Sequence, residues 1–157
     1  MEYIYFYESP LGQIGIGADE VGITDIYFVQ SEIERPRERK ETPLIKEAGK
    51  QLAEYFSGER KEFSFPLHMK GTKFQVSVWE ALLNIPYGET RSYKDIAIAI
   101  GNEKACRAVG LANNKNPIVI AVPCHRVIGA NGTLVGYGGG LHIKENLLQL
   151  EGVVYKA

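Results

Sequence analysis

The sequence predicts an α+β protein in which a small antiparallel sheet with one helix precedes a helical domain. Three observations support this prediction. Strand-forming residues separated by turn signals fill residues 1–28, and apolar residues at helical spacing dominate after residue 72. Residues 1–66 carry 13 acidic and 8 basic side chains, whereas residues 67–157 carry 6 acidic and 10 basic ones. We therefore expect two domains, residues 1–66 and 67–157.

The first domain should begin with three strands, at residues 3–7, 13–16 and 21–28. Turn-forming residues separate them, which favours an antiparallel meander. Residues 32–42 are highly charged and include Pro36, so we expect an exposed connection there.

A helix should follow from Pro43 to about Phe56, because proline suits the first helical position and Ser57-Gly58 is a typical end. Its apolar residues recur at helical spacing: Leu44, Ala48, Leu52 and Tyr55. Residues 63–65 predict a further short strand. No residue of this domain indicates a catalytic function.

The second domain should contain three helices in succession. Thr72 can cap the first, Ser92 begins the second with a capping box, and Asn102 can cap the third, residues 103–113. The last two, joined at a Gly-Asn turn, are typical of a helix-turn-helix, whose second helix usually enters a groove of DNA. Many small helical hairpins never touch DNA, so this pattern alone does not decide the function.

Six glycines between residues 129 and 140 indicate either close approach of the backbone to a ligand or a surface loop. No lysine and Ser/Thr pair follows, which argues against a nucleotide triphosphate site. A last helix, residues 142–151, should bury Ile143, Leu147 and Leu150 and end at Gly152.

The chemistry of the chain centres on Cys124, which follows an apolar run and Pro123 and precedes His125 and Arg126. A cysteine reacts as a thiolate, which needs positive charge or a general base close by. His125 and Arg126 are candidates for both needs. A lone cysteine often serves only as a small core residue, but these neighbours favour a nucleophile.

Pro123-Cys124-His125-Arg126-Val127 resembles the active-site motif of the O6-alkylguanine-DNA alkyltransferases, also called methylated-DNA–protein-cysteine methyltransferases. Other segments resemble the rest of the family pattern in order and spacing: residues 78–82, 85–90, 92–93, 107–110, 116–117 and 139–141. The resemblance implies a ribonuclease H-like first domain. It also implies DNA repair by irreversible, single-turnover alkyl transfer from O6-alkylguanine, and less readily O4-alkylthymine, with base flipping.

The resemblance assigns roles in the reaction to five residues. Cys124 accepts the alkyl group, His125 is its base through a water, and Glu151 orients His125. Asn116 fixes the turn that carries the nucleophile. Arg107 fills the space that the flipped nucleotide leaves and pairs with the orphaned base.

The resemblance also assigns the pocket. Tyr93 crowds the phosphate and donates a hydrogen bond to the base, while the carbonyls of Cys124 and Val127 accept from the guanine amine. The amide of Gly138 donates to the leaving oxygen. Many family members carry serine at the position of Gly138, so only this main-chain contact is carried over. The walls are formed by Tyr137 and Val119.

We expect no cofactor. We also expect no metal, because Cys106 and Cys124 are too few for a thiolate zinc site and neither has metal-type spacing with a histidine. No apolar stretch approaches the ~20 residues of a membrane span, and the first residues lack a secretory pattern. We therefore expect a cytoplasmic monomer whose partner is double-stranded DNA containing O6-alkylguanine, and not a membrane.

Three alternatives compete with this interpretation. Alkyltransferase-like proteins sense lesions without repairing them, but they carry tryptophan at the position of Cys124. A plain helix-turn-helix regulator explains the helical hairpin and leaves residues 123–127 unexplained. A cysteine hydrolase with a Cys-His-Glu triad would turn over on esters or amides.

Overall fold

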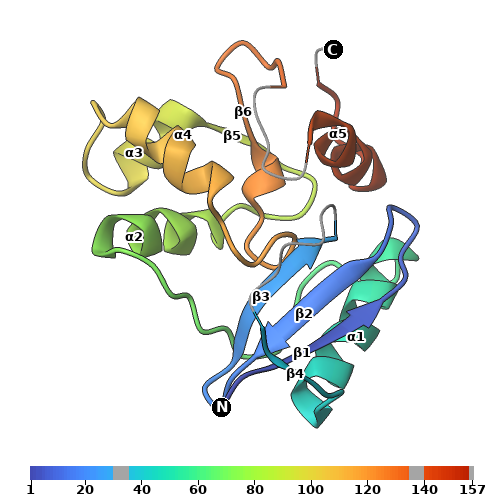
Figure 1. Ribbon diagram of the computed structural model, residues 1–157. Helices are drawn as coiled ribbons and strands as arrows, with labels where there is room; N and C mark the ends of the chain where they lie inside the picture. Colours follow the sequence, from blue (N-terminus) through green and yellow to red (C-terminus); the bar gives the residue numbers. More distant parts are fainter. Residues whose placement is uncertain (30–35, 135–139, 156–157) are drawn as a thin grey trace. The chain divides into compact units, whose positions relative to one another are not determined.

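The computed structural model describes residues 1–29, 36–134 and 140–155. The chain forms two compact units, Met1–Met69 and Lys70–Ala157 (Figure 1). In the described part of the chain, no helix has both the length and the apolar character needed to cross a membrane.

The first unit is built on a four-stranded sheet. β1 (Tyr3–Tyr7), β2 (Ile14–Ala18) and β3 (Ile23–Phe28) pair antiparallel in sequence order, which confirms the predicted meander. β4 (Glu38–Arg39) pairs parallel with β1, so the sheet is mixed and its order is β3-β2-β1-β4. The sheet is mixed and not antiparallel throughout, because the open edge of β1 is paired by the segment predicted to be only a connection.

One face of the sheet is covered by α1 (Pro43–Phe56), whose ends lie where the sequence predicted them. Thr42 caps its start by accepting a hydrogen bond from a first-turn amide, and Ser57 caps its end. Gly49 allows the Tyr7 ring to lie directly against the helix, since a Cβ at this position would come within 2.9 Å of the ring. The helix and the sheet therefore share one apolar core.

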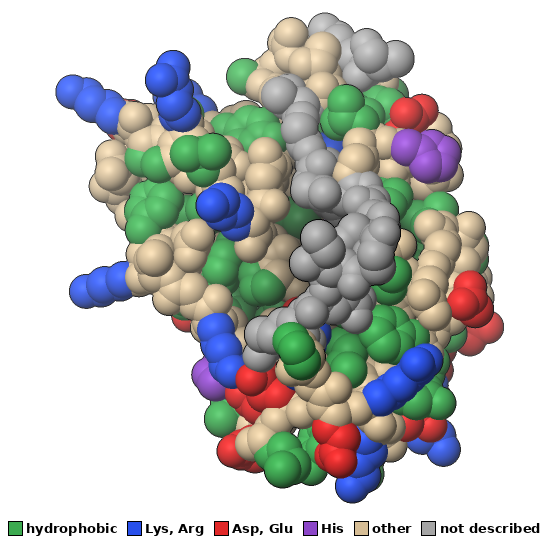
Figure 2. Space-filling view, in the orientation of Figure 1, with side chains coloured by type: hydrophobic (Ala, Val, Ile, Leu, Met, Phe, Trp, Pro, Cys, Tyr) green, Lys and Arg blue, Asp and Glu red, His purple; other side chains and the backbone are tan. Residues whose placement is uncertain are grey.

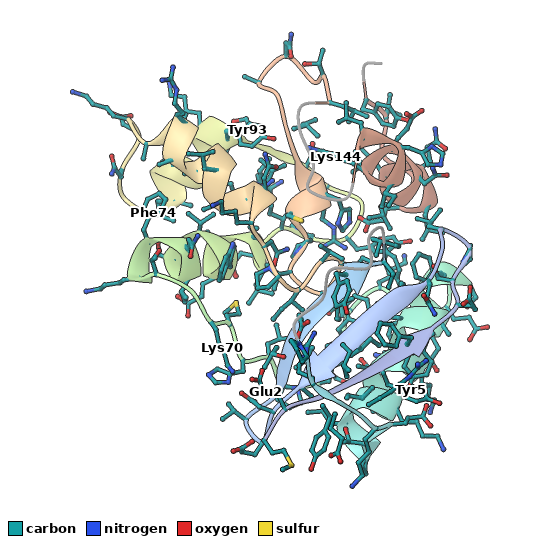
Figure 3. The ribbon with its side chains drawn as sticks, in the orientation of Figure 1. Glu2, Tyr5, Lys70, Phe74, Tyr93 and Lys144 are labelled. Carbon is teal, nitrogen blue, oxygen red and sulfur yellow. The ribbon has the colours of Figure 1, made fainter. Side chains whose placement is uncertain are left out.

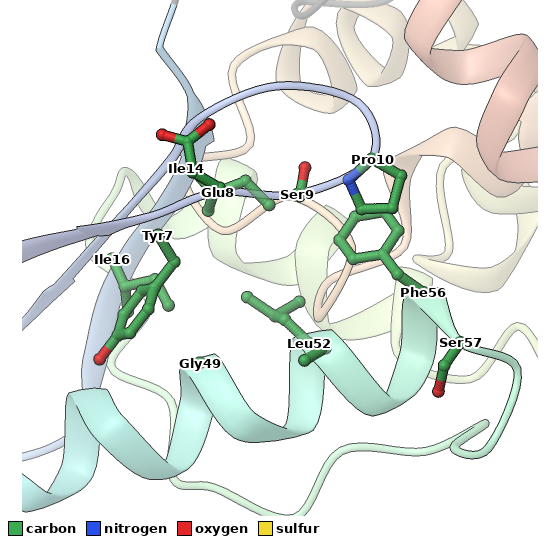
Figure 4. Close-up of a pocket in the computed structure, with 11 residues that line it drawn as sticks. Tyr7, Glu8, Ser9, Pro10, Ile14, Ile16, Gly49, Leu52, Phe56 and Ser57 are labelled. Carbon is green, nitrogen blue, oxygen red and sulfur yellow. The ribbon is translucent and has the colours of Figure 1, made fainter.

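A cavity of about 280 Å³ lies in this unit, between α1 and the turn that follows β1 (Figure 4). Most of its lining is apolar: Tyr7, Pro10, Ile14, Ile16, Leu52, Ala53 and Phe56. The described residues that line it include no cysteine, histidine or basic side chain. The reactive groups to which the sequence points all lie in the second unit.

The segment from Phe63 to Phe65 does not form the predicted strand. The amide N–H of Ser64 donates to the Gln51 side chain at 2.9 Å, and Gln51 donates in turn to Ser64 Oγ at 2.8 Å. The Phe63 ring also packs against Tyr55 of α1. The prediction failed because a side chain of the helix takes up the amide that a strand would use for pairing.

The second unit is mostly helical. In chain order its elements are α2 (Lys73–Leu82), β5 (Arg91–Ser92), α3 (Tyr93–Ala99), α4 (Cys106–Asn114), the 3-10 turn η1 (Cys124–Arg126), β6 (Val127–Ile128) and α5 (Leu141–Leu150). Figure 1 shows α2, α3 and α4 together as one cluster. β5 pairs parallel with β6, which joins the start of α3 to the chain just after η1.

Two of the three helix starts predicted near residues 72, 92 and 102 agree with the structure. Capping boxes are present at Thr72 and Ser92, as predicted. Asn102 does not cap α4, which begins at Cys106, three residues later than predicted. The Ala105 amide donates to the Asn102 carbonyl at 3.0 Å, so residues 102–105 form a turn of their own.

Trp79 holds α2 against α4. Its side chain is buried, and the indole N–H donates to the carbonyl of Ala112 at 2.9 Å. A buried indole keeps its polar atom satisfied in this way. This bond therefore fixes the position of α4 against α2. It also fixes the start of the chain that continues from α4 toward Cys124.

Candidate active site

Two tight turns deliver the chain to Cys124, which opens η1 and is buried. The first is a γ-turn centred on Ile120, closed by an N–H···O bond of 2.8 Å. The φ of Ile120 is 72°, a left-handed conformation that β-branched residues rarely adopt. The second turn is centred on Pro123, whose φ of −80° and ψ of 64° are those of an inverse γ-turn. Cys124 therefore sits on a compact loop and not on a regular strand.

Asn116 closes this loop from within. Its Nδ2 donates to the carbonyl of Val122 at 2.7 Å, and its Oδ1 accepts from the amide of Ile118 at 2.9 Å. The side chain is buried, so both bonds are shielded from water. Asn116 thus joins the two ends of the loop that precedes Cys124.

His125 and Glu151 form a fully buried pair, with Nε2 and Oε2 2.7 Å apart. Burial lowers the pKa of His125 more than the neighbouring carboxylate raises it, so His125 is neutral at neutral pH. A neutral ring that donates from Nε2 has an unprotonated Nδ1. This Nδ1 is buried and has no hydrogen-bond partner among the described residues.

Glu151 accepts three further hydrogen bonds. Arg126 donates from Nε at 2.8 Å and from Nη2 at 3.1 Å, and the amide of Gly88 donates at 3.1 Å. Burial by itself would raise the pKa of Glu151, but the bonds from His125 and Arg126 outweigh burial and hold the pKa below its usual range. Glu151 therefore stays ionised, although it caps the carboxyl end of α5, where the helix dipole disfavours an anion.

The guanidinium of Arg126 has three hydrogen bonds to fixed partners. The sequence made it a candidate for the positive charge beside the thiol. Its guanidinium is instead bound by Glu151 and by the carbonyl of Ile85, to which Nη1 donates at 2.8 Å. Arg126 therefore holds the carboxylate in place.

Lys144 is a functional candidate that sequence reasoning missed. Its side chain comes from α5, is completely buried, and donates from Nζ to the carbonyl of Val127 at 2.6 Å (Figure 3). Burial lowers its pKa to about 8, while interaction with Cys124 acts in the opposite direction. A buried ammonium that interacts with Cys124 favours the thiolate form. Lys144 precedes Leu147 by three residues and Leu148 by four, and this helical spacing was the signal in the sequence that it is buried.

Tyr93 begins α3 and is half-buried near Cys124. Burial raises the pKa of its hydroxyl, and interaction with Cys124 raises it further. Its ring lies over Gly110 of α4, where a Cβ would be in ordinary van der Waals contact at 3.8 Å. Tyr93 thus adjoins both Cys124 and α4.

Arg107 lies on the exposed face of α4. Figure 2 shows Lys and Arg side chains projecting from the part of the surface formed by α2, α3 and α4. The exposed lysines of this part of the chain are Lys70, Lys73, Lys94, Lys104 and Lys115. A surface of this charge suits a polyanion such as DNA.

The remaining predicted residues are divided between described and undescribed segments. Val127 is buried and begins β6, and Val119 is half-buried in the loop before Cys124. Tyr137 and Gly138 lie outside the described residues. Within residues 1–29, 36–134 and 140–155, no cluster of three or more His, Cys, Asp or Glu side chains could hold a metal ion.

A buried cysteine next to a buried histidine–glutamate pair, in a unit with an exposed basic surface, is the arrangement expected of a DNA-binding protein with a reactive thiol. Two sequence models of known families match the chain. One, described as 6-O-methylguanine DNA methyltransferase, DNA binding domain, covers residues 73–153. The other, the ribonuclease-like domain of the same proteins, covers residues 3–69 and confirms the fold expected for the first domain.

Similar proteins cover nearly the whole chain. A methylated-DNA–protein-cysteine methyltransferase of Methanosarcina acetivorans is 56% identical over 96% of this chain and 98% of its own length. A constitutive one of Bacillus subtilis is 52% identical over 99% of both. The crystal structure of Mycobacterium tuberculosis OGT in complex with DNA is 47% identical, with a TM-score of 0.88 over 95% of this chain and 92% of that one. The chain belongs to the methylated-DNA–protein-cysteine methyltransferase family, which repairs O6-methylguanine in DNA by methyl transfer to a cysteine.

Proposed function

We propose that this chain transfers the alkyl group of O6-alkylguanine, and less readily of O4-alkylthymine, irreversibly to Cys124, after the damaged nucleotide has rotated out of the duplex. The observation that carries the proposal is the buried Glu151–His125 pair adjoining Cys124 in a unit that presents an exposed basic surface. The relatives are archaeal and bacterial, and we place the reaction in the cytoplasm, on double-stranded DNA, with the protein acting as a monomer.

The proposed reaction begins with the proton of Cys124. His125 Nδ1, kept unprotonated because Nε2 donates to Glu151, accepts this proton through a water. The ammonium of Lys144 favours the resulting thiolate. The sulfur then attacks the alkyl carbon in line with O6. The S–C bond forms as the C–O bond breaks, the electron pair stays on guanine, and guanine takes up a proton.

The supporting roles follow the same geometry. Asn116 holds the loop of the nucleophile, and its two buried bonds support this role. Tyr93 donates to the flipped base from its position beside Cys124, and the Val127 carbonyl accepts from the guanine amine. Arg107, exposed on α4, fills the vacated space in the duplex.

The pocket also involves three residues whose roles come from the family resemblance. Val119 lines the pocket from the half-buried loop before Cys124. Tyr137 forms another wall, and the Gly138 amide donates to the leaving oxygen.

The test is the stoichiometry with a large excess of duplex that carries O6-methylguanine. A thioether is not cleaved by any group of the site, so one methyl per protein should be transferred in a burst, and the reaction should then stop. Intact-protein mass should rise by one methylene, mapped to the peptide with Cys124. Continued turnover with unmodified Cys124 would instead support a cysteine hydrolase, and strong preference for one operator sequence would support a regulator.

A further inference from the structure

The exocyclic amine of a flipped guanine has two N–H groups, and the site offers fewer free acceptors than the family resemblance suggests. The carbonyl of Cys124 already accepts two hydrogen bonds, from the amide of Val127 and from Asn113 Nδ2 at 3.3 Å. The carbonyl of Val127 accepts one, from Lys144. Since a carbonyl oxygen has two lone pairs, the bonds made by the described residues leave Val127 one acceptor position and Cys124 none.

Asn113 supplies a further acceptor beside the nucleophile. It lies on α4, and its side chain is only 1% exposed. Its amide must direct Nδ2 toward the Cys124 carbonyl, because two acceptor oxygens would repel each other, and Oδ1 is then turned away from that bond. Oδ1 is buried and has no hydrogen-bond partner among the described residues. A buried acceptor in this condition calls for a donor from beyond the described residues, and a bound base can supply one.

We infer that Asn113 is a substrate-binding residue: its Oδ1 accepts one N–H of the exocyclic amine of the flipped O6-alkylguanine, while the Val127 carbonyl accepts the other. The inference rests on the proposed function, because it requires a flipped purine beside Cys124. Asn113 and Arg107 lie on different faces of α4, one buried and one exposed. One helix thus contacts the duplex and the extruded base at once.

The consequence is selectivity for the amine. A purine without the 2-amino group leaves Oδ1 buried and unpaired, and sites built to bind a polar group reject analogues that lack it. The measurement compares two duplexes that differ only in one nucleotide, O6-methylguanine or O6-methylhypoxanthine. Single-turnover rates with saturating protein give the guanine-to-hypoxanthine ratio for each variant.

Asn113→Leu keeps the size of the side chain and removes the acceptor. The ratio should fall about tenfold relative to the wild type, through a slower reaction of the guanine substrate. Asn113→Asp keeps the acceptor and loses the donor to Cys124, so it should retain the ratio even if both rates fall. The matched control is Asn114→Leu, on the exposed neighbour, which should also retain the ratio.

A ratio that stays at the wild-type value in Asn113→Leu would overturn the inference, as would equal slowing of both substrates, which is the mark of a purely structural role. Equal wild-type rates on the two duplexes would overturn it even if neither Asn113 variant folds. In all these outcomes methyl transfer to Cys124 still occurs. Absence of transfer from either duplex by the wild type would instead contradict the proposed function.

Discussion

Replacing Lys144 with methionine should make the protein more stable at neutral pH and slower in methyl transfer. The ammonium is completely buried and its pKa falls to about 8, so the folded protein carries an unfavourable charge at neutral pH. Methionine has a similar length, no charge and enough flexibility to fill the same space. Transfer should slow because the thiolate of Cys124 loses a neighbouring cation.

The magnitude follows from the two pKa values of Lys144. One pKa unit corresponds to about 1.4 kcal/mol, so the change from 10.5 to about 8 costs about 3 kcal/mol below pH 8. The variant also leaves the Val127 carbonyl without its donor, at a cost of about 1–2 kcal/mol. We therefore expect a net gain of about 1–2 kcal/mol in the free energy of unfolding at neutral pH.

The pH dependence of the free energy of unfolding should differ between the wild type and the variant, with a sign set by the pKa of Lys144. Between pH 8 and 10.5 the unfolded chain holds the Lys144 proton and the folded protein releases it, so the unfolded state binds more protons. The wild type should therefore gain stability as the pH rises through this window, whereas the variant should not. Above pH 10.5 the burial cost is gone, and the variant should be the less stable protein.

The assay is urea unfolding followed by the fluorescence of Trp79, the only tryptophan of the chain, which is buried in the same unit. Lys94→Met, at an exposed lysine, is the matched control and should change neither the stability nor its pH dependence appreciably. A Lys144→Met variant that is less stable at every pH, by a constant amount, would refute the reasoning.

Three further predictions concern the site. Cys124→Ser should abolish methyl acceptance and leave duplex binding by fluorescence anisotropy nearly unchanged, whereas loss of acceptance in Cys106→Ser would show that the wrong cysteine is assigned. Arg107→Ala should slow transfer from duplex DNA far more than transfer from a free alkylated base, which needs no flipping, and equal slowing would place Arg107 in the pocket. Glu151→Gln should lower the free energy of unfolding by about 3–5 kcal/mol in urea titrations, because Arg126 is left buried without its anion; a loss below about 1 kcal/mol would argue against this pairing.

Elements with local signals were predictable from the sequence. The limits of α1 follow from Pro43 and from Ser57-Gly58, and the capping boxes of α2 and α3 involve residues only three positions apart. Elements decided by distant contacts were not. The segment from Phe63 to Phe65 has the composition of a strand, but Gln51, from an earlier helix, binds its main chain.

Candidate site residues could be named from the sequence where a motif exists and not where burial decides. Cys124 and His125 lie in a contiguous motif. Asn113 and Lys144 are polar residues in helices and were therefore not singled out. Their spacing places both on buried faces, Asn113 four residues after Val109 and Lys144 four before Leu148, but only the folded chain shows which main-chain carbonyls they reach.

The four hydrogen bonds to the Glu151 carboxylate have a consequence for how this sequence can change. They come from η1 and from the loop before β5, so the histidine and the arginine depend on one side chain at the end of α5. A substitution at position 126 or 151 therefore requires a matching substitution at the other, because a buried charge without its opposite charge is strongly destabilising. A library randomised at both positions should return sequences in which the two residues are complementary. Positions that can change independently lie elsewhere, on the surface.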